Sequence, residues 1–194
     1  MHAIAAALRN NSGTIVAFLV IPLILSLCTL GYNFGRFGAL LDFGYARIPG
    51  VLQEPWYQHG LFSLHAVPWN AYKMLFEGLT DIPRFPYLRP HAFGASILLT
   101  SPLLFLLFRE GGKDRTLCWN VIGILTLALW LHGNPGGWQF SYRYAMILLP
   151  WMFLLLLTNG PRCLTNTEAT LAAVSFALNG MATYQFLWTD QIKP

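Results

Sequence analysis

Long apolar runs constrain this chain more than any other feature of its sequence. Five segments consist mostly of apolar residues and carry almost no charge, at 14–30, 92–108, 117–132, 142–158 and 168–188. A helix spans the hydrocarbon core of a bilayer with about 20 apolar residues, within a range of roughly 17–25. Pro22, Pro102 and Pro150 fall inside three segments, where neighbouring helices can satisfy the backbone groups that a proline frees. The sequence therefore predicts an all-α membrane protein with about five transmembrane helices, in a single membrane domain over 1–194.

The composition excludes the common classes of soluble protein. Only 10% of the residues are charged and 55% are hydrophobic, whereas an ordinary soluble domain carries about 25% charged residues. A soluble protein of this size needs a polar coat, because so much of its surface faces water. We therefore exclude a free-standing cytosolic enzyme, a nucleic-acid-binding domain and a disordered protein.

Basic residues in the short connections predict the orientation in the membrane. They occur at Arg9, in the connection 109–116 and in the connection 159–167, which alternating spans place on one side. The positive-inside rule makes that side cytoplasmic. The long loop 32–91 and the connection 133–141 then face outward.

The segment 14–30 has one alternative interpretation, a cleaved signal peptide. Its apolar run is longer than the roughly 7–15 residues of a signal-peptide core, and no small-residue cleavage site follows it cleanly. An uncleaved span is therefore the favoured interpretation.

The outer loop 32–91 is rich in aromatic residues and prolines, which predicts a structured loop with interfacial helices. Within it, 68–79 is expected to form a short helix lying in the headgroup plane. Its apolar stripe is formed by Val67, Ala71, Met74, Leu75 and Leu79. Lys73 and Glu77 lie off this stripe, four residues apart, and are expected to form an ordinary surface pair.

The first motif that could bind a ligand is YNFGRFG at 32–38, followed by DFGY at 42–45. Its glycines permit tight turns and close approach of another backbone. Arg36 would emerge where the first span leaves the membrane, and a guanidinium there can bind an anionic headgroup through two hydrogen bonds. The alternative is a snorkelling arginine paired with Asp42.

The second constellation is GGWQFSYRY at 136–144, where the outer connection enters the fourth predicted span. An arginine just inside a span is costly and normally has a partner or a ligand, which points to Arg143. The segment also offers apolar walls and hydrogen-bonding groups, from Trp138, Gln139, Ser141, Tyr142 and Tyr144. Together they suit a phosphate or a sugar. The alternative is an aromatic belt around a snorkelling arginine.

Signals for other chemistry are sparse, and we expect neither a cofactor nor a metal. No His or Cys pattern has metal-ligand spacing, and neither a glycine-rich phosphate loop nor a Gly-x-Ser-x-Gly elbow occurs. His59 and Glu54 could form an acid–base pair in the outer loop, although a structural role is favoured.

These motifs together resemble a known family. The residues of 32–38 and 42–45 are similar to the Tyr-Asn-x-x-Arg-Phe-Gly…Phe-Gly-Tyr pattern of bacterial membrane glycosyltransferases of the GT-C superfamily, related to the protein mannosyltransferases and lipid A aminoarabinose transferases. The run 138–144, followed by Leu149-Pro150, resembles their later Trp-x-Phe-Gly-x-Arg-Tyr…Pro segment, with Ser141 where Gly is common. Gly94-x-Ser96 and Ser101-Pro102 fit the same order. The resemblance covers most of 14–158 and corresponds to the carboxyl-terminal half of those proteins.

In that superfamily a polyprenyl-phosphate sugar is the donor and transfer occurs at the outer face. An acidic residue in an early outer loop acts there as a base or metal-associated carboxylate, and this chain resembles only the half that follows. The resemblance implies that Arg36 and Arg143 hold the lipid-linked phosphate, where cationic groups would stabilise charge on the departing phosphate. Catalytic residues are not assigned.

The resemblance thus predicts a fragment of, or a partner subunit to, such a glycosyltransferase in the bacterial inner membrane. Its partners would be membrane lipids, the polyprenyl-phosphate sugar and a partner chain that supplies the catalytic loop, but no nucleic acid. A non-catalytic membrane scaffold or lipid-binding protein is the alternative. A transporter ranks third, because no internal repeat is visible.

Overall fold

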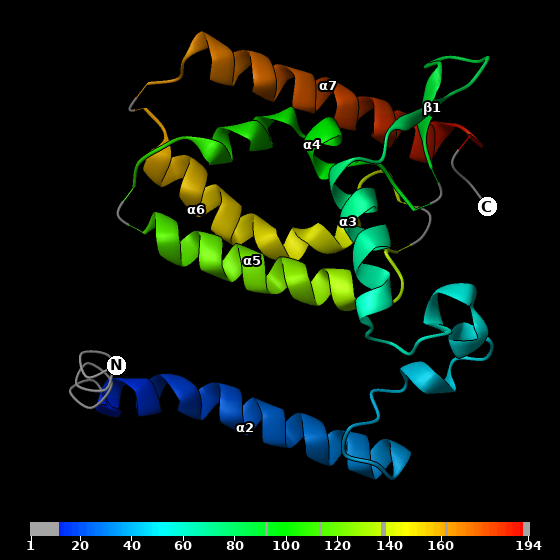
Figure 1. The fold of residues 1–194 in the computed structure, drawn as a ribbon, viewed down its shortest axis with the longest axis vertical. Helices are drawn as coiled ribbons and strands as arrows, with labels where there is room; N and C mark the ends of the chain where they lie inside the picture. Colours follow the sequence, from blue (N-terminus) through cyan, green and yellow to red (C-terminus); the bar gives the residue numbers. More distant parts are fainter. Residues whose placement is uncertain (1–11, 92, 113, 137–138, 162, 192–194) are drawn as a thin grey trace. The chain divides into compact units, whose positions relative to one another are not determined.

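The computed structural model describes residues 12–91, 93–112, 114–136, 139–161 and 163–191. The chain is mostly helical, with 65% of residues in helices and 6% in strands, which confirms the helical class predicted from the sequence. Contacts group the chain into two compact units, Met1–Glu54 and Pro55–Pro194. The predicted single membrane domain over 1–194 stays a prediction, and the two units are described separately below (Figure 1).

The first unit contains one long helix, α2 (Ser12–Phe37), which continues through Pro22. Its stretch Val16–Phe37 has a mean hydropathy of 2.0, and this is the one helix in the described part of the chain that is long and apolar enough to cross a membrane. At a rise of about 1.5 Å per residue it exceeds the thickness of a bilayer core. The helix therefore extends beyond the predicted run 14–30 and takes in most of the YNFGRFG motif.

The chain after α2 folds back on the end of the helix. Gly38 and Gly44 both have positive φ, and a Cβ atom on Gly44 would lie 2.7 Å from the ring of Phe37. Asp42 accepts hydrogen bonds from the Gly44 N–H and from Arg47, while Arg47 also donates to the Phe37 carbonyl. Two short 3-10 helices follow, η1 (Tyr45–Arg47) and η2 (Val51–Gln53). Gly38 and Gly44 therefore form turns, as the sequence indicates, whereas Gly35 lies within α2.

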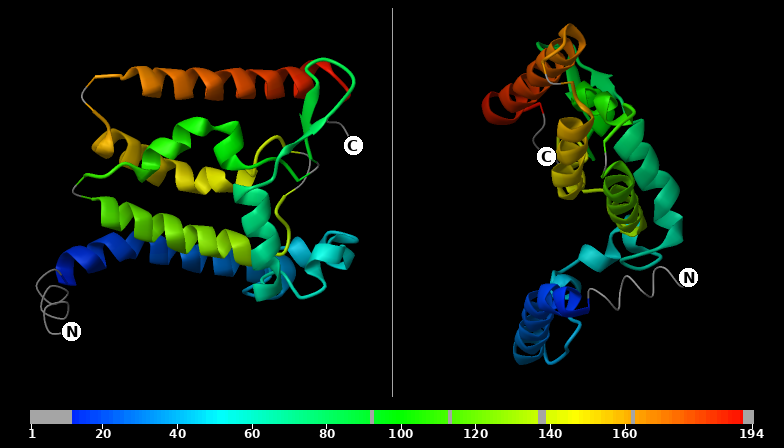
Figure 2. Two further views of the ribbon diagram at one scale, coloured as in Figure 1. Left: turned by 45° about the horizontal axis from the view of Figure 1, so that its top comes forward. Right: turned by 90° about the vertical axis from the view of Figure 1, so that its left-hand side faces the viewer.

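The second unit holds the remaining described elements. In chain order they are η3 (Pro55–Tyr57), η4 (Leu64–Ala66), α3 (Val67–Leu75), β1 (Leu79–Asp81), β2 (Leu88–Pro90), α4 (Ile97–Thr100), η5 (Pro102–Phe108), α5 (Arg115–Leu131), η6 (Arg143–Leu148), α6 (Leu149–Asn159) and α7 (Asn166–Trp188). Strands β1 and β2 form an antiparallel hairpin with Thr80 opposite Arg89. Helix α5 packs against α6, and η5 lies between α6 and α7 and contacts both (Figures 1 and 2).

The core of this unit lies where α5, α6 and η5 meet α3. Leu148 and Leu155 are fully buried there. They pack in one cluster with Cys118 and Ile122 from α5 and Met74 from α3. The apolar faces that the sequence assigns to separate spans therefore pack on one another.

The predicted span 92–108 is not a continuous helix in the structure. Helix α4 ends before Ser101, whose φ of −137° and ψ of 71° are not helical, and the chain restarts at Pro102 as the 3-10 helix η5. Helix α7 satisfies the backbone groups beside this break: Asn179 donates to the Thr100 carbonyl at 2.9 Å, and Ser175 accepts from the Leu103 N–H at 3.1 Å. The break is therefore a stabilised feature of the fold.

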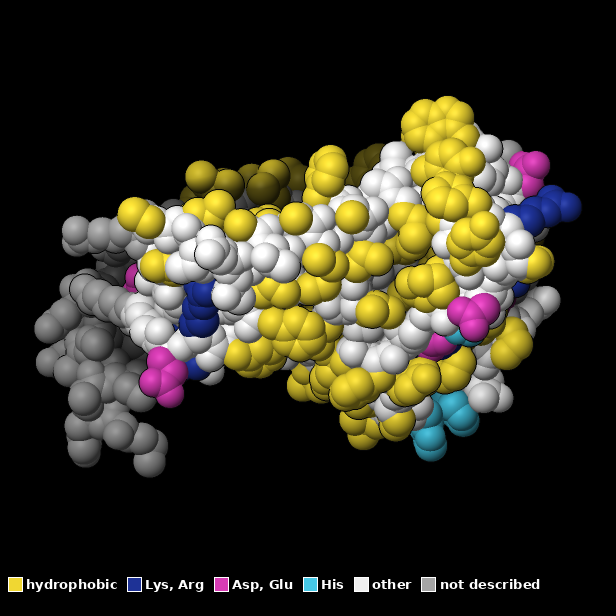
Figure 3. Space-filling view, turned by 90° about the horizontal axis from the view of Figure 1, so that it is seen from above, with side chains coloured by type: hydrophobic (Ala, Val, Ile, Leu, Met, Phe, Trp, Pro, Cys, Tyr) yellow, Lys and Arg dark blue, Asp and Glu magenta, His cyan; other side chains and the backbone are white. Residues whose placement is uncertain are grey.

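The five predicted spans are not supported as five membrane-length helices. Helix α5 and the combined segment Arg143–Asn159 are apolar but shorter than α2. Helix α7 is long enough, but polar residues such as Asn179 and Gln185 lower its apolar character. Their side chains donate to the carbonyls of Thr100 and Leu88 in other segments. Viewed from the α7 side, hydrophobic side chains cover much of the middle of the face and charged side chains lie toward its two ends (Figure 3).

The predicted interfacial helix 68–79 appears as the shorter α3, and Leu79 belongs to strand β1. The expectation of an ordinary surface pair is wrong: Lys73 and Glu77 are 7% and 5% exposed, with Nζ and Oε2 2.7 Å apart. They are buried because the turn after α3 is tied to Ser96, which donates through its N–H to the Glu77 carbonyl and through its hydroxyl to the Leu75 carbonyl.

Candidate lipid-phosphate groove

A groove of about 550 Å³ lies in the second unit, between α4–η5, η6–α6 and α7. Its volume is in the range of ordinary ligand sites, roughly 300–1,000 Å³. Most of its lining is apolar, with side chains such as Leu104, Met146 and Phe186, while Ser101, Ser141 and Asn179 add polar groups. Arg143 is the one charged residue among the described residues that line it.

Arg143 begins η6 and is exposed. Its guanidinium lies 5.8 Å from the centre of the Tyr144 ring, and no carboxylate in the described part of the chain is within ion-pair distance of it. The exposed guanidinium therefore has donors that no carboxylate of the described residues engages. Such a group can form paired, charge-assisted hydrogen bonds to a phosphate.

Gln139 fixes the backbone from which Arg143 projects. It is 4% exposed, and its amide nitrogen donates to the carbonyls of Phe93 and Pro135, each at 2.9 Å. Its amide oxygen accepts from the Arg143 N–H at 3.3 Å. Its hydrogen-bonding groups are thus engaged by the protein, so Gln139 is placed as a positioning residue.

The two predicted tyrosines contact each other, but only Tyr142 lines the groove. Tyr142 is 2% exposed and donates its hydroxyl to the Leu129 carbonyl at 3.4 Å. Tyr144 packs edge-on against both Tyr142 and His132. Tyr142 lines the groove, and Tyr144 supports Arg143 from its side. Trp138, which the sequence also assigns to this site, lies outside the described residues.

Two motifs that are distant in the sequence contact each other behind the groove. Ala95 pairs with the strand-like segment at Ser141, donating to the Phe140 carbonyl at 2.8 Å and accepting from the Tyr142 N–H at 3.2 Å. A Cβ atom on Gly94 would lie 2.9 Å from the Ser141 carbonyl carbon, so only glycine fits there. The structure therefore brings the 94–96 segment against the segment that ends at Arg143.

Arg36 belongs to the first unit, in the last turn of α2. It donates to the Tyr32 hydroxyl at 2.9 Å, and its guanidinium lies 5.0 Å from the centre of the Phe37 ring. Asp42, the alternative partner considered from the sequence, pairs with Arg47 at 2.8 Å. The Gly44 N–H and Arg47 hold the pKa of Asp42 below its ordinary value.

Residues that the sequence did not single out complete the site. Asn179 and Ser175 of α7 bind the backbone at the break beside the groove, and their polar character within an apolar run was the available signal.

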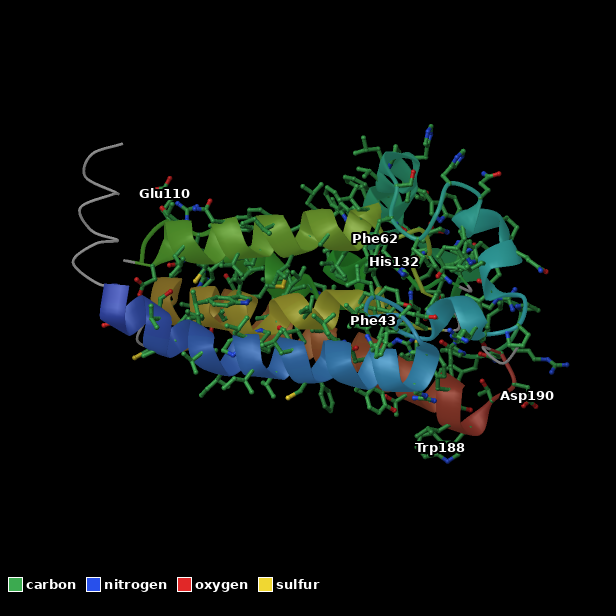
Figure 4. The ribbon with its side chains drawn as sticks, turned by 90° about the horizontal axis from the view of Figure 1, so that it is seen from below. Phe43, Phe62, Glu110, His132, Trp188 and Asp190 are labelled. Carbon is green, nitrogen blue, oxygen red and sulfur yellow. The ribbon has the colours of Figure 1, made fainter. Side chains whose placement is uncertain are left out.

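An ion pair lies at the far end of the unit, outside the groove. Arg109 pairs there with Glu168, which also forms a capping box with Thr165. Glu110 lies at this end, opposite His132 and Asp190 (Figure 4).

Within the described residues no group of three or more His, Cys, Asp or Glu side chains is placed to hold a metal ion. Comparison of the chain with protein-family models, with curated proteins and with solved structures found no match in any of the three.

Proposed function

We propose that this chain is an integral protein of the bacterial inner membrane that binds a polyprenyl-phosphate-linked sugar at the outer interface. In this proposal it contributes the lipid-phosphate cleft of a membrane glycosyltransferase. The observation that carries the proposal is the largely apolar groove whose one charged lining residue, Arg143, has no acidic partner in the described chain.

The chemistry of the groove matches an anionic amphiphile. Its apolar walls favour burial of a hydrocarbon chain, since each buried methylene contributes about 0.8 kcal/mol. An unpaired guanidinium favours a phosphate, because hydrogen bonds between charged groups are worth about 1.5–3 kcal/mol. A neutral lipid would use only the walls, so binding should depend on the phosphate.

The membrane setting rests on two observations. Helix α2 is apolar around its whole circumference, with side chains such as Phe18 and Ile21 exposed, which suits a lipid environment. In the second unit, Arg109 begins one connection that the positive-inside rule places on the cytoplasmic side, and it pairs with Glu168 in the first turn of α7, which follows the other such connection. Five spans would follow if α4 with η5, α5, η6 with α6, and α7 cross the bilayer together with α2, and this arrangement belongs to the proposal.

The proposal assigns binding, and not proton abstraction, to this groove. None of the described residues that line it carries a carboxylate. A base for the acceptor hydroxyl would therefore come from another segment or from the partner chain expected from the family resemblance. If no such partner exists, the chain is the lipid-binding scaffold that stands as the alternative.

The test is a binding measurement on the whole chain in nanodiscs, with fluorescent undecaprenyl phosphate as probe and undecaprenol as the phosphate-free control. Arg143→Ala should weaken phosphate binding about 10- to 100-fold, in line with the loss of a charge-assisted contact. Undecaprenol should bind equally to both proteins. Arg84→Ala, which removes an exposed arginine outside this groove, serves as the matched control and should change affinity less than about twofold.

Two results would contradict the proposal. One is equal affinity of the wild type and Arg143→Ala for the phosphate probe. The other is equal affinity of the wild type for the probe with and without phosphate. Reconstitution with candidate partner chains then separates the enzyme component from the scaffold, because only the former supports sugar transfer that Arg143→Ala abolishes.

A further inference from the structure

A second pocket of about 270 Å³ lies in the outer segment of the same unit, away from the groove. It is lined by aromatic and imidazole side chains together with small polar groups, chiefly Trp56, Gln58, His59, Ser63, His65 and Trp69. The volume lies just below the roughly 300–1,000 Å³ of ordinary ligand sites, so the occupant is limited to about one ring-sized molecule.

The pocket is built on the carboxyl-terminal end of α5. Ser63 donates its N–H to the Leu131 carbonyl at 2.7 Å, and Gly133 donates to the Leu61 carbonyl at 2.9 Å. A Cβ atom on Gly133 would lie 2.8 Å from the Trp56 carbonyl oxygen, so the two segments approach as closely as glycine allows. Phe62 and His132 mark this junction in Figure 4, where their rings meet edge to face. The wall of the pocket is thereby fixed to the helical core.

The two histidines are stacked. The rings of His59 and His65 lie 4.2 Å apart with an angle of 23° between their planes. An imidazole nitrogen binds zinc at about 2.0–2.1 Å along its lone pair, which lies in the ring plane. Nearly parallel rings direct their lone pairs side by side and not toward one point. The stacked geometry therefore disfavours a metal ion and leaves the ring nitrogens as hydrogen-bonding groups.

The absence of charged side chains from the described lining of the pocket disfavours an ionic ligand. No Lys, Arg, Asp or Glu is among its described lining residues. The ammonium of Lys73 contacts the Trp69 ring at 4.6 Å, but Lys73 is paired with Glu77 and does not line the pocket. A phosphate or carboxylate would have no fixed cation here, and a cationic ligand would have no anion. The favoured occupant is neutral.

We propose that this pocket binds a single neutral sugar ring. A pyranose has an apolar C–H face and an edge of hydroxyl groups. Trp56 and Trp69 supply aromatic surface for the face, while Gln58, Ser63 and the stacked imidazoles supply donors and acceptors for the hydroxyl groups. The site is separate from the Arg143 groove and does not depend on its proposed function. It would bind a sugar whether or not that sugar is attached to a lipid.

The experiment is saturation-transfer NMR on the whole chain in nanodiscs, with the methyl glycosides of glucose, mannose and galactose as probes. The wild type should give saturable transfer to the ring protons of at least one glycoside. Trp69→Ala should weaken that binding about tenfold or more, since Trp69 is half exposed and a bound ring would cover its free surface, and Trp69→Phe should restore most of it. His65→Phe keeps a stacking ring but removes its nitrogens, and should also weaken binding.

The controls separate this site from the groove and from folding. Trp188→Ala removes an exposed tryptophan outside the pocket and should leave glycoside binding unchanged. Arg143→Ala should also leave it unchanged, so failure of the lipid proposal does not decide this one. The proposal is overturned if no glycoside binds the wild type, or if Trp69→Ala and His65→Phe both bind as the wild type does. Displacement of the glycosides by Zn²⁺ or inorganic phosphate would likewise overturn it.

Discussion

Helix α2 and the segment 97–108 are both apolar runs that contain a proline, yet only α2 is one continuous helix. Pro22 sits inside α2 without ending it, whereas the chain breaks at Ser101 before Pro102. At the second site Asn179 and Ser175 of α7 bind the backbone groups beside the break. The difference teaches that a proline ends a helix here only where a neighbouring element supplies polar partners.

The two regions also differ in where their apolar side chains go. Leu25 of α2 is 60% exposed, while Leu155 of α6 is fully buried in the core of the second unit. The second unit therefore has a core of its own. Helix α2 has no comparable burial within the first unit, so its apolar surface is left for lipid or a partner. Cys118 lies in that core and is fully buried, whereas Cys28 and Cys163 are exposed, so the labelling of Cys118, followed separately by peptide mass spectrometry, reports opening of the second unit.

The largest expected effect comes from removing the lysine that pairs with a buried carboxylate in the second unit. Lys73→Met removes the lysine partner of Glu77, which is itself 5% exposed, and leaves His91, whose Nε2 lies 3.2 Å from the same carboxylate. Breaking a buried ion pair in this way costs about 3–5 kcal/mol, so Cys118 should react much faster in detergent. The double variant Lys73→Met with Glu77→Gln removes both charges and should recover much of the loss. Wild-type Cys118 protection in Lys73→Met would show that the pair does not stabilise the unit.

A matched pair of truncations compares the two regions directly. Leu155→Ala should destabilise the second unit by about 2–5 kcal/mol, because it leaves a cavity in the core. Leu25→Ala should change stability by less than about 0.5 kcal/mol, as is usual for an exposed site. Loss of helical circular dichroism on heating in micelles measures both variants, and Cys118 labelling reports the second unit separately. If the two truncations lower stability equally, the claim that Leu155 is in a core and Leu25 is not would be contradicted.

The account of the break at Ser101 is tested by removing the Asn179 side chain, which donates to the Thr100 carbonyl beside it. Asn179→Leu should cost about 1–3 kcal/mol, since the Thr100 carbonyl is left without its hydrogen bond. Thr183→Ala, one turn further along α7, removes only a bond to the carbonyl of its own helix and is the control. Cys118 labelling again gives the stability. If the two variants are equally stable, the account of the break is wrong.

The smallest effect concerns the turn that follows α2. Because the folded-state pKa of Asp42 is lowered, its contribution is present above the ordinary value of 3.8 and is lost as the pH falls through the lowered value. Exchange of the Gly44 amide, which donates to Asp42 at 2.7 Å, should therefore gain protection as the pH rises through this window. Asp42→Asn should remove the pH dependence. Persistence of the dependence in Asp42→Asn would assign it to another group.

The apolar runs predicted much of the helical structure, because the length and composition of such a run can be read from the local sequence. Four predicted spans coincide at least in part with the helices α2, α5, α6 and α7. The break in 92–108 could not be predicted, since it depends on side chains of α7 that are more than seventy residues away in the sequence. Helices α5 and α7 begin close to their predicted positions because charged residues and a capping box precede them.

The sequence placed part of the groove lining in one motif, because Arg143 and Tyr142 are adjacent in the chain. Their role in binding stays a prediction. Gln139 was expected to face a ligand, but its bonds to Phe93 and Pro135 arise from a chain crossing that no local pattern encodes. The burial of Lys73 and Glu77 was missed for the same reason, because Ser96 closes over that turn from another segment. The five spans and the lipid ligand stay predictions.

The most direct test of the central claim is photo-crosslinking with a polyprenyl phosphate that carries a diazirine in its chain. If the groove holds this lipid, adducts should concentrate on its described walls, at Met146 and Phe186, and should fall sharply in Arg143→Ala. A phosphate-free polyprenol of the same length should not show this dependence. Adducts spread along the exposed surface of α2, or unchanged by Arg143→Ala, would contradict a phosphate-dependent lipid site in the second unit.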